Sequence, residues 1–253
     1  MTNQAYGQFC GLARALEVVG EPWAMLIIRD LLVGAKSFAD LQRGLPVVSA
    51  GLLGTRLREL EQAAVVIRAT PTDEPEPTVY ELTTFGRELE PVVIGLARWG
   101  VRSLGGLRQD EIVTPDSMIM ALRVTFRAEA AKGLRLNFTL EISDFVVHAR
   151  IENGLLTAGR GTLPNPDLII HAGPVLKSLM AGEMSPREAM ESGGIRLRGP
   201  EGSVGDPALL AWFAELFHIL PAPPPDITID GLVPMAVRPA PEVLAISATA
   251  TAG

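Results

Sequence analysis

The segment from Ser49 to Gln62 constrains the fold of this chain more than any other stretch. Its leucines recur at the i, i+4, i+7 spacing of one buried helix face, and these are Leu53, Leu57 and Leu60. Ser49 precedes this face as a helix N-cap. The polar residues off the stripe are Thr55, Arg56 and Arg58. An ordinary amphipathic core helix with solvated arginines has the same periodicity, so the neighbouring elements must decide what this helix does.

The elements around this helix follow the order of a winged helix-turn-helix. Apolar periodicity and helix stop signals predict three earlier helices, at residues 12–19, 23–32 and 38–43. A turn at 45–48 leads into the Ser49 helix. Two β-rich runs at 65–69 and 79–82 flank a proline-rich turn at 70–78, as in a β-wing, and one helix is predicted at 85–102. We expect a mainly-α winged helix-turn-helix over residues 8–104, a fold that binds DNA.

Residues 8–104 contain a set of short motifs that occur together in one family. They are Cys10, Ala15-Leu16, Gly20-Glu21-Pro22-Trp23, Ile28-Arg29-Asp30-Leu31, Phe38 with Leu41, the helix from Ser49 to Glu61, and Tyr80-Glu81-Leu82-Thr83 with Gly86. In these motifs the segment resembles the HxlR type of winged-helix transcriptional regulator. The resemblance implies a homodimer paired through the first and last helices, with each Ser49 helix in the major groove of double-stranded DNA. It also implies repression or activation of nearby transcription. The apolar stripe expected at the dimer contact is Leu89, Val92, Leu96 and Trp99.

The residues expected at the DNA are Lys36, Ser37, Ser49, Ala50, Gly51, Thr55, Arg56, Arg58 and Arg68. The net charge of −7 argues against broad polyanion binding. Phosphate contact therefore depends on a local basic patch, to which Arg43 also belongs. The helix departs from the resembled family at Ala50, Gly51 and Gly54, where such regulators usually carry basic or polar residues. We therefore expect few contacts to base edges.

The 253-residue chain is too long for one winged helix, and its pattern changes near Gly105-Gly106. Beyond this point strands are predicted at 134–140, 145–151, 155–161, 167–170 and 195–198, with helices at 174–180, from 185, and at 206–217. Asn153-Gly154 predicts a type I′ hairpin. Ser185-Pro186-Arg187-Glu188 has the pattern of a helix start with a capping box. We expect an α+β domain over residues 111–220.

This order of elements resembles the sterol carrier protein type 2 fold. The matching motifs are the Asp167 strand, Lys177-Ser178-Leu179, Gly182, Ser185-Pro186, the strand from Gly194 to Gly199 and the helix from Leu209 to Phe217. The resemblance implies an apolar tunnel for fatty-acyl or other lipid-like molecules, serving here to sense an effector. The expected lining residues are Phe138, Leu140, Phe145, Leu179, Met180, Trp212, Phe213 and Phe217. Each of them is also a typical residue of a packed core.

Two other functions compete with a ligand-sensing regulator. The first is a lipid or small-molecule binding protein whose winged helix serves only dimerisation, as Gly51 and Gly54 indicate. The second is an enzyme that uses the tunnel for acyl chemistry, but no nucleophile constellation is present, so no enzyme is expected. The histidines are not spaced as metal ligands, and neither a metal nor a cofactor is expected.

Cys10 is the only cysteine and precedes the first helix, where some members of the resembled family sense oxidants. An inert buried thiol is the alternative interpretation. A single cysteine excludes an internal disulfide and suits a reducing compartment. No apolar run has the length of a membrane span, so we expect no membrane association and a cytoplasmic location. Residues 221–253 are predicted to be a proline-rich connector and C-terminal tail.

Overall fold

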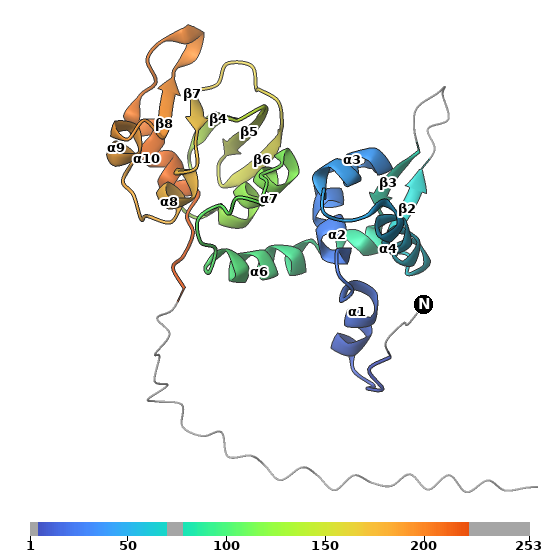
Figure 1. The fold of residues 1–253 in the computed structure, drawn as a ribbon. Coiled ribbons are helices and arrows are strands. Elements are labelled where there is room, and N and C mark those ends of the chain that lie inside the picture. The colour runs from blue at the N-terminus through green and yellow to red at the C-terminus, as the bar shows by residue number, and fades with distance from the viewer. Residues whose placement is uncertain (1–4, 70–77, 223–253) are drawn as a thin grey trace, which may run out of the picture. The chain divides into compact units, whose positions relative to one another are not determined.

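The computed structural model describes residues 5–69 and 78–222 (Figure 1). The helices of the first half are α1 (Gly11–Val19), α2 (Ala24–Val33), α3 (Phe38–Gly44), α4 (Ala50–Gln62), α5 (Thr84–Arg87) and α6 (Glu90–Val101). An antiparallel sheet in the order β1-β3-β2 is formed by β1 (Lys36–Ser37), β2 (Val66–Ala69) and β3 (Val79–Leu82). The predicted winged helix-turn-helix is confirmed. All but residue 78 of the turn predicted at 70–78 lies outside the described residues.

Helix α4 forms as its sequence predicts. The Ser49 hydroxyl accepts the N–H of Leu52 at 3.3 Å, which satisfies one of the amides that a helix start leaves without a partner. The leucine face is fully buried in a core shared with α2, α3 and the wing strands, and consists of Leu53, Leu57 and Leu60. Burial of this face leaves the opposite side of α4 toward solvent.

The prediction of one helix over residues 85–102 was wrong, because the chain forms α5 and α6 with a break at Leu89. Thr83 caps α5 by accepting the N–H of Gly86 at 2.9 Å. Gly86 lies against the wing so closely that a Cβ there would stand 2.1 Å from the carbonyl oxygen of Val65. Pro91 lies in the first turn of α6, where its missing N–H costs no hydrogen bond. Glu88 and Leu89 separate the two helices and both keep right-handed helical φ and ψ.

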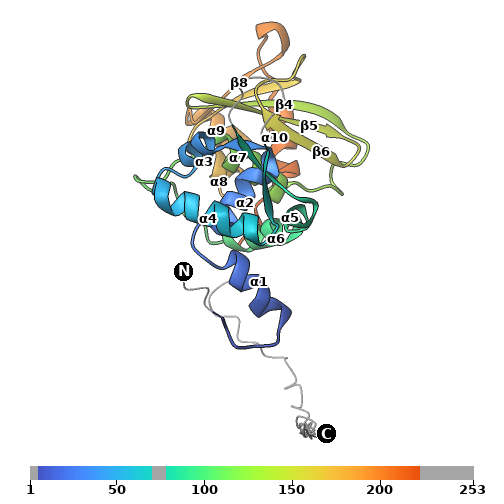
Figure 2. The same cartoon turned by 90° about the vertical axis from the view of Figure 1, so that its right-hand side faces the viewer.

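The second half is a sheet with helices on one face (Figures 1 and 2). Its strands are β4 (Arg135–Ile142), β5 (Phe145–Glu152), β6 (Leu155–Arg160), β7 (Leu168–Ala172) and β8 (Ile195–Arg198). They pair in the order β6-β5-β4-β7-β8, with β4 and β7 parallel and the other neighbours antiparallel. Its helices are α7 (Pro115–Thr125), α8 (Leu176–Met180), α9 (Pro186–Glu191), the short 3₁₀ helix η1 (Pro200–Gly202) and α10 (Pro207–Leu216). The α+β prediction is confirmed at this level.

Two local predictions in this half are also confirmed. Asn153 and Gly154 both have positive φ, 48° and 84°, as a type I′ turn requires, and they join β5 to β6. Ser185 and Glu188 form the reciprocal capping box of α9, since each side chain accepts the backbone N–H of the other residue.

Helix α7 was not among the predicted elements, and it joins the two hydrophobic cores. Ile119 and Leu122 are buried in the core beneath the sheet. Met120 and Val124 are buried in the core of the winged helix-turn-helix. The halves of the chain therefore pack on opposite sides of one helix.

Candidate functional site

The N-terminal half of α4 offers an open polar surface, and α4 lies at the front of the molecule in Figure 2. Ser49, Ala50 and Gly51 are exposed. The Thr55 hydroxyl donates to the carbonyl of Gly51 at 3.0 Å and accepts from Nη2 of Arg58 at 3.1 Å. Arg58 is itself exposed. These residues, which the sequence assigned to DNA contact, lie together on the solvent side of the helix.

Gly51 is not required by the packing of the protein itself. A Cβ built at this position meets no atom within 4 Å, so the space beside the helix is open. Glycine in a helix costs up to about 1 kcal/mol relative to alanine. The open space leaves room for a partner to approach the α4 backbone closely.

Arg56 has a different environment from the one expected for a phosphate contact. Its guanidinium pairs with Glu21 at 2.8 Å and with Glu59 at 2.5 Å, and it donates to the carbonyl of Pro22 at 3.2 Å. Only 13% of the side chain is exposed. Its charge is compensated within the protein, and the residue ties α4 to the turn between α1 and α2.

Lys36 also lies apart from the α4 surface. Its ammonium group is buried and stands 3.2 Å from Oδ1 of Asp116 in α7. Asp116 also accepts two hydrogen bonds from Arg160 of β6, at 3.1 and 2.7 Å. Ser37, the next expected DNA contact, caps α3 by accepting the N–H of Asp40 at 3.1 Å. Both residues therefore have partners inside the protein.

The remaining arginines of the expected basic patch are exposed. Arg43 pairs with Asp40 inside α3. Arg68 lies 3.2 Å from Glu61, and its guanidinium stands over the Tyr80 ring at 5.4 Å from the centroid. Ion pairs at such exposed positions contribute little to stability.

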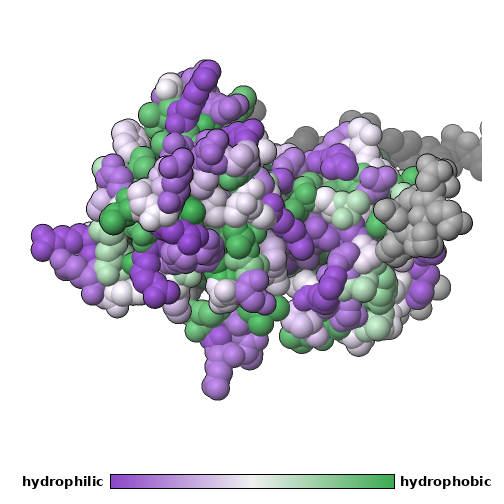
Figure 3. Space-filling model, turned by 90° about the horizontal axis from the view of Figure 1, so that it is seen from above, coloured by the Kyte–Doolittle hydropathy of each residue, from purple (hydrophilic) through white to green (hydrophobic). Residues whose placement is uncertain are grey.

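Helix α6 carries three large apolar side chains that are mostly exposed among the described residues. Val92, Leu96 and Trp99 are 53%, 54% and 72% exposed, and Leu89 is half-buried. Exposed apolar side chains also occur on α1, at Leu12 and Leu16. In the face seen from above, hydrophobic patches are scattered between hydrophilic side chains (Figure 3). Val92, Leu96 and Trp99 lie on α6 and Leu89 directly precedes it, and the exposure of the three helix residues is typical of a protein interface.

The first half matches the sequence profile of the HxlR-like helix-turn-helix family at residues 18–106. The uncharacterized HTH-type transcriptional regulator YdeP of Bacillus subtilis is 33% identical over 91 residues, which cover 36% of this chain and 71% of YdeP. The chain belongs to the HxlR-like helix-turn-helix family.

Two further relatives match this HxlR-like chain over its first half. The uncharacterized HTH-type transcriptional regulator YtcD of Bacillus subtilis is 34% identical over 105 residues, which cover 42% of this chain and 83% of YtcD. The solved structure of the redox regulator HypR in its oxidized form is 32% identical and covers 38% of this chain and 99% of its own, with a TM-score of 0.36. The family profile ends at residue 106, so α7 to α10 and the five-stranded sheet lie beyond it.

Most residues expected to line an apolar tunnel lie together beneath the sheet. Phe138, Phe213 and Phe217 have no exposed surface, and their rings pack at centroid distances of 5.4, 4.7 and 6.5 Å. Leu140, Leu179 and Met180 are buried in the same core, with Phe145 partly buried at its edge. Trp212 is different, because it is 44% exposed on the outer side of α10.

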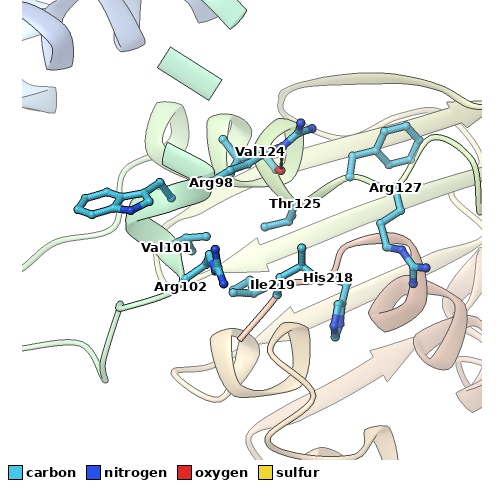
Figure 4. A pocket seen from close by; sticks show the side chains of 11 residues that line it. Arg98, Val101, Arg102, Val124, Thr125, Arg127, His218 and Ile219 are labelled. Carbon is cyan, nitrogen blue, oxygen red and sulfur yellow. Dashed lines mark hydrogen bonds between the residues drawn. The ribbon is translucent and has the colours of Figure 1, made fainter. Parts of the chain in front are cut away.

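A cavity of about 470 Å³ lies elsewhere, between α6, the end of α7 and the segment after α10 (Figure 4). Its lining residues are Arg98, Trp99, Val101, Arg102, Val124, Thr125, Phe126, Arg127, His218, Ile219 and Leu220. Figure 4 shows Arg102, Thr125 and Ile219 around the same space. The sequence interpretation missed this cavity, because α7 was not predicted and the three segments are far apart in the chain.

Cys10 is exposed at the N-cap of α1. Hydrogen bonds from the backbone of Ala13 and Leu12 lower the pKa of its thiol. Within residues 5–69 and 78–222, no three His, Cys, Asp or Glu side chains are placed to hold a metal ion. Among these same residues no helix has both the length and the apolar character needed to cross a bilayer.

Proposed function

We propose that this HxlR-like protein is a cytoplasmic, homodimeric regulator of transcription that binds double-stranded DNA through α4 and the wing. The observation that carries the proposal is the uncovered polar side of α4, with Ser49, Gly51 and Arg58 exposed opposite a buried leucine face. In winged helix-turn-helix domains the second helix of the motif enters the major groove. Membership of the HxlR-like family supports the same use of α4.

We assign to the DNA a smaller set of residues than the sequence indicated. The proposed contacts are Ser49, Ala50, Gly51, Thr55, Arg58 and Arg68, with Arg43 as a further phosphate contact. Lys36 is omitted because its ammonium group is buried against Asp116, and Ser37 because its hydroxyl caps α3. Arg56 is omitted because Glu21 and Glu59 hold its guanidinium. The reduced set supports recognition that relies on backbone contact and DNA shape more than on base edges.

The homodimer is supported by the exposed stripe of α6. Large apolar side chains such as Leu96 and Trp99 remain in water in a single chain, and a second copy that covers them gains the free energy of removing that surface from water. The stripe is self-complementary if α6 pairs with α6 about a twofold axis. We propose that Leu89, Val92, Leu96 and Trp99 form this contact.

The α+β domain is proposed to bind an apolar effector, in keeping with its resemblance to the sterol carrier protein type 2 fold. Support comes from the fold, a sheet with one apolar face covered by α7 and α10. Helix α7 gives such an effector a route to the DNA-binding half, because residues of this helix are buried in both cores.

A salt-dependent binding titration tests the DNA-binding function. The full chain is mixed with labelled duplex from the neighbourhood of its own coding region and with a scrambled duplex of equal length. We expect tighter binding to the native duplex and an apparent affinity that falls linearly with salt on logarithmic axes. Equal and weak binding to both duplexes at low salt contradicts the proposal.

A second candidate function is a ligand-binding protein whose winged helix serves only dimerisation. Gly51 and Gly54 in α4 and the internal partners of Lys36 and Arg56 favour it, because they reduce the free charge near the helix. Under this function the chain remains a dimer by light scattering and binds ligand, while the duplex titration shows no specific complex.

A further inference from the structure

We propose that the cavity between α6, α7 and the segment after α10 binds an amphiphilic anion, a small apolar molecule with one acidic head group. This inference deepens the proposed function, because it gives the effector a site and a chemical class. The cavity volume of about 470 Å³ is in the usual range of about 300–1,000 Å³ for small-molecule sites. None of its lining residues is among those to which the sequence assigned the ligand, and it borders that aromatic core at Phe126, whose ring centroid lies 5.7 Å from that of Phe217.

The charged side chains that line the cavity are all basic. Its lining includes the arginines Arg98, Arg102 and Arg127 and no aspartate or glutamate. Arg127 is compensated by an ion pair with Glu215. Among the described residues, neither Arg98 nor Arg102 has a carboxylate partner. Two cationic groups therefore remain at the cavity without a counter-charge from the described chain.

The two arginines are held in place by their Nε atoms. Nε of Arg98 donates to the carbonyl of Val124 at 2.9 Å, and Nε of Arg102 donates to the carbonyl of Pro221 at 3.1 Å. These bonds restrain each side chain and do not involve its Nη groups. Guanidinium groups held in this way are suited to charge-assisted hydrogen bonds with a carboxylate or phosphate oxygen.

The rest of the lining is mostly apolar. It includes Val101, Phe126 and Ile219, and also Leu220 and Trp99, which are 65% and 72% exposed. An alkyl or aromatic body in the cavity removes part of this surface from water. Apolar walls with two fixed cations describe a site for a molecule with an apolar body and an anionic head.

Occupation of the cavity bears directly on the proposed dimer contact. Trp99 lines the cavity and also belongs to the exposed stripe of α6. A ligand that contacts α6 and α7 favours the arrangement of these helices to which it binds more tightly, and so shifts the population of the DNA-binding form. Ligand binding therefore acts on α6, the same helix that is proposed to form the dimer contact.

The site is tested by isothermal titration of the full chain with decanoate, with 1-decanol as the uncharged ligand of equal chain length. We expect one decanoate per chain and at least about tenfold weaker binding of 1-decanol, since a charge-assisted hydrogen bond is absent. The double variant Arg98→Gln with Arg102→Gln should bind decanoate at least about tenfold more weakly. Arg98→Lys with Arg102→Lys should recover only part of the affinity, because the charge is kept but the Nε bond that holds each arginine is lost.

Arg135→Gln is the matched control, because Arg135 is exposed at the start of β4 and does not line the cavity. It should leave decanoate affinity unchanged. If the double glutamine variant fails to fold, Arg102→Gln alone gives the same comparison. Equal decanoate affinity in the wild-type and glutamine variants, or equal affinity for 1-decanol, overturns the proposal.

A separate readout distinguishes this inference from the proposed function. Duplex binding is measured with and without saturating decanoate. Decanoate that binds through the arginines but leaves duplex affinity unchanged supports the site and contradicts its role as an effector site. A second outcome is a chain that binds no duplex but loses decanoate binding in the glutamine variants. This outcome likewise supports the site and contradicts only the DNA-binding function.

Discussion

The ammonium group of Lys36 lies 3.2 Å from the carboxylate of Asp116, and both side chains are nearly removed from water, at 8% and 3% exposed. This ion pair joins β1 of the wing, directly before α3, to the first turn of α7. Arg160 adds a second cation to the same carboxylate from β6. One aspartate thus connects the helix-turn-helix, α7 and the sheet.

Asp116→Ala should destabilise the protein strongly, because it leaves the Lys36 ammonium buried without a partner. Breaking a buried pair in this way costs about 3–5 kcal/mol of unfolding free energy. Urea denaturation of the wild type and the variant measures the difference. Glu129→Ala, which removes an exposed pair with Lys132, is the control and should change stability by less than about 0.5 kcal/mol. A decrease below about 1 kcal/mol for Asp116→Ala would show that the buried pair contributes little.

Asp30 should make stability depend on pH in a direction opposite to that of an ordinary paired carboxylate. Burial raises the pKa of the Asp30 carboxyl, although the neighbouring Arg29 acts to lower it. The folded chain therefore holds this proton more tightly than the unfolded chain, where the pKa is about 3.9. The stabilising contribution is present at low pH and is lost as pH rises through the folded-state pKa.

Asp30→Asn removes this titration. The free energy of unfolding of the wild type, relative to that of the variant, should decrease as pH rises from about 4 to about 7. Urea denaturation across this range gives the difference, in which the contributions of the other carboxylates largely cancel. A wild type that gains stability over the variant with rising pH would contradict the assignment.

Two glycines in the first half should respond oppositely to alanine. Gly54→Ala should stabilise the protein by up to about 1 kcal/mol, because a Cβ there makes only ordinary contacts at 3.8 and 3.9 Å inside α4. Gly86→Ala should destabilise it by about 1–3 kcal/mol, because its Cβ would overlap the Val65 carbonyl. Thermal melting of both variants checks the pair. A stabilising Gly86→Ala would contradict the close contact of α5 with the wing.

Leu96→Asp with Trp99→Asp should convert the proposed dimer to a folded monomer. Both side chains are exposed within one chain, so charges there cost little in the monomer but are buried without partners in the dimer. Light scattering measures the molar mass. Leu155→Asp, at a residue 74% exposed at the start of β6, is the control and should stay dimeric. A dimer that survives the double change has its contact elsewhere.

Replacement of Arg58 and replacement of Arg56 should have different effects, because Arg58 is proposed to contact DNA and Arg56 has its partners inside the protein. Arg58→Ala should weaken duplex binding and reduce the salt slope by about 0.9, because one arginine no longer neutralises a phosphate, with stability nearly unchanged. Arg56→Ala should instead lower the melting temperature, because Glu21 and Glu59 lose their shared partner. Fluorescence anisotropy at several salt concentrations, together with melting curves, gives both quantities. The reverse pattern would place Arg56 at the DNA.

Elements with strong local signals could be predicted from the sequence. The cap and leucine stripe of α4, the Asn153-Gly154 turn and the capping box at Ser185 each depend on residues within a few positions of one another. Their geometry is determined by backbone preferences and hydrogen bonds inside the segment. In these segments capping, turn chemistry and apolar pattern all favour the same structure.

The features that the sequence did not reveal depend on distant partners. Lys36 and Asp116 are 80 positions apart, and Arg56 and Glu21 are 35 positions apart, so the sequence shows the charges without their pairing. Helix α7 has a capped start at Thr114-Pro115, but it is buried on two sides and lacks the single apolar stripe of a surface helix. The capped start was the sequence signal from which α7 could have been predicted.

The burial of α7 in both cores sets how this protein can be divided. A fragment cut at Gly105-Gly106 would lose Met120 and Val124 from its interior, and the remaining piece would expose them. We therefore expect the two halves to unfold cooperatively, in one heat-absorption peak. A chimaera that exchanges the α+β half for another should retain α7 and graft its new sheet after Thr125, because this helix is structurally part of the winged helix-turn-helix half as well.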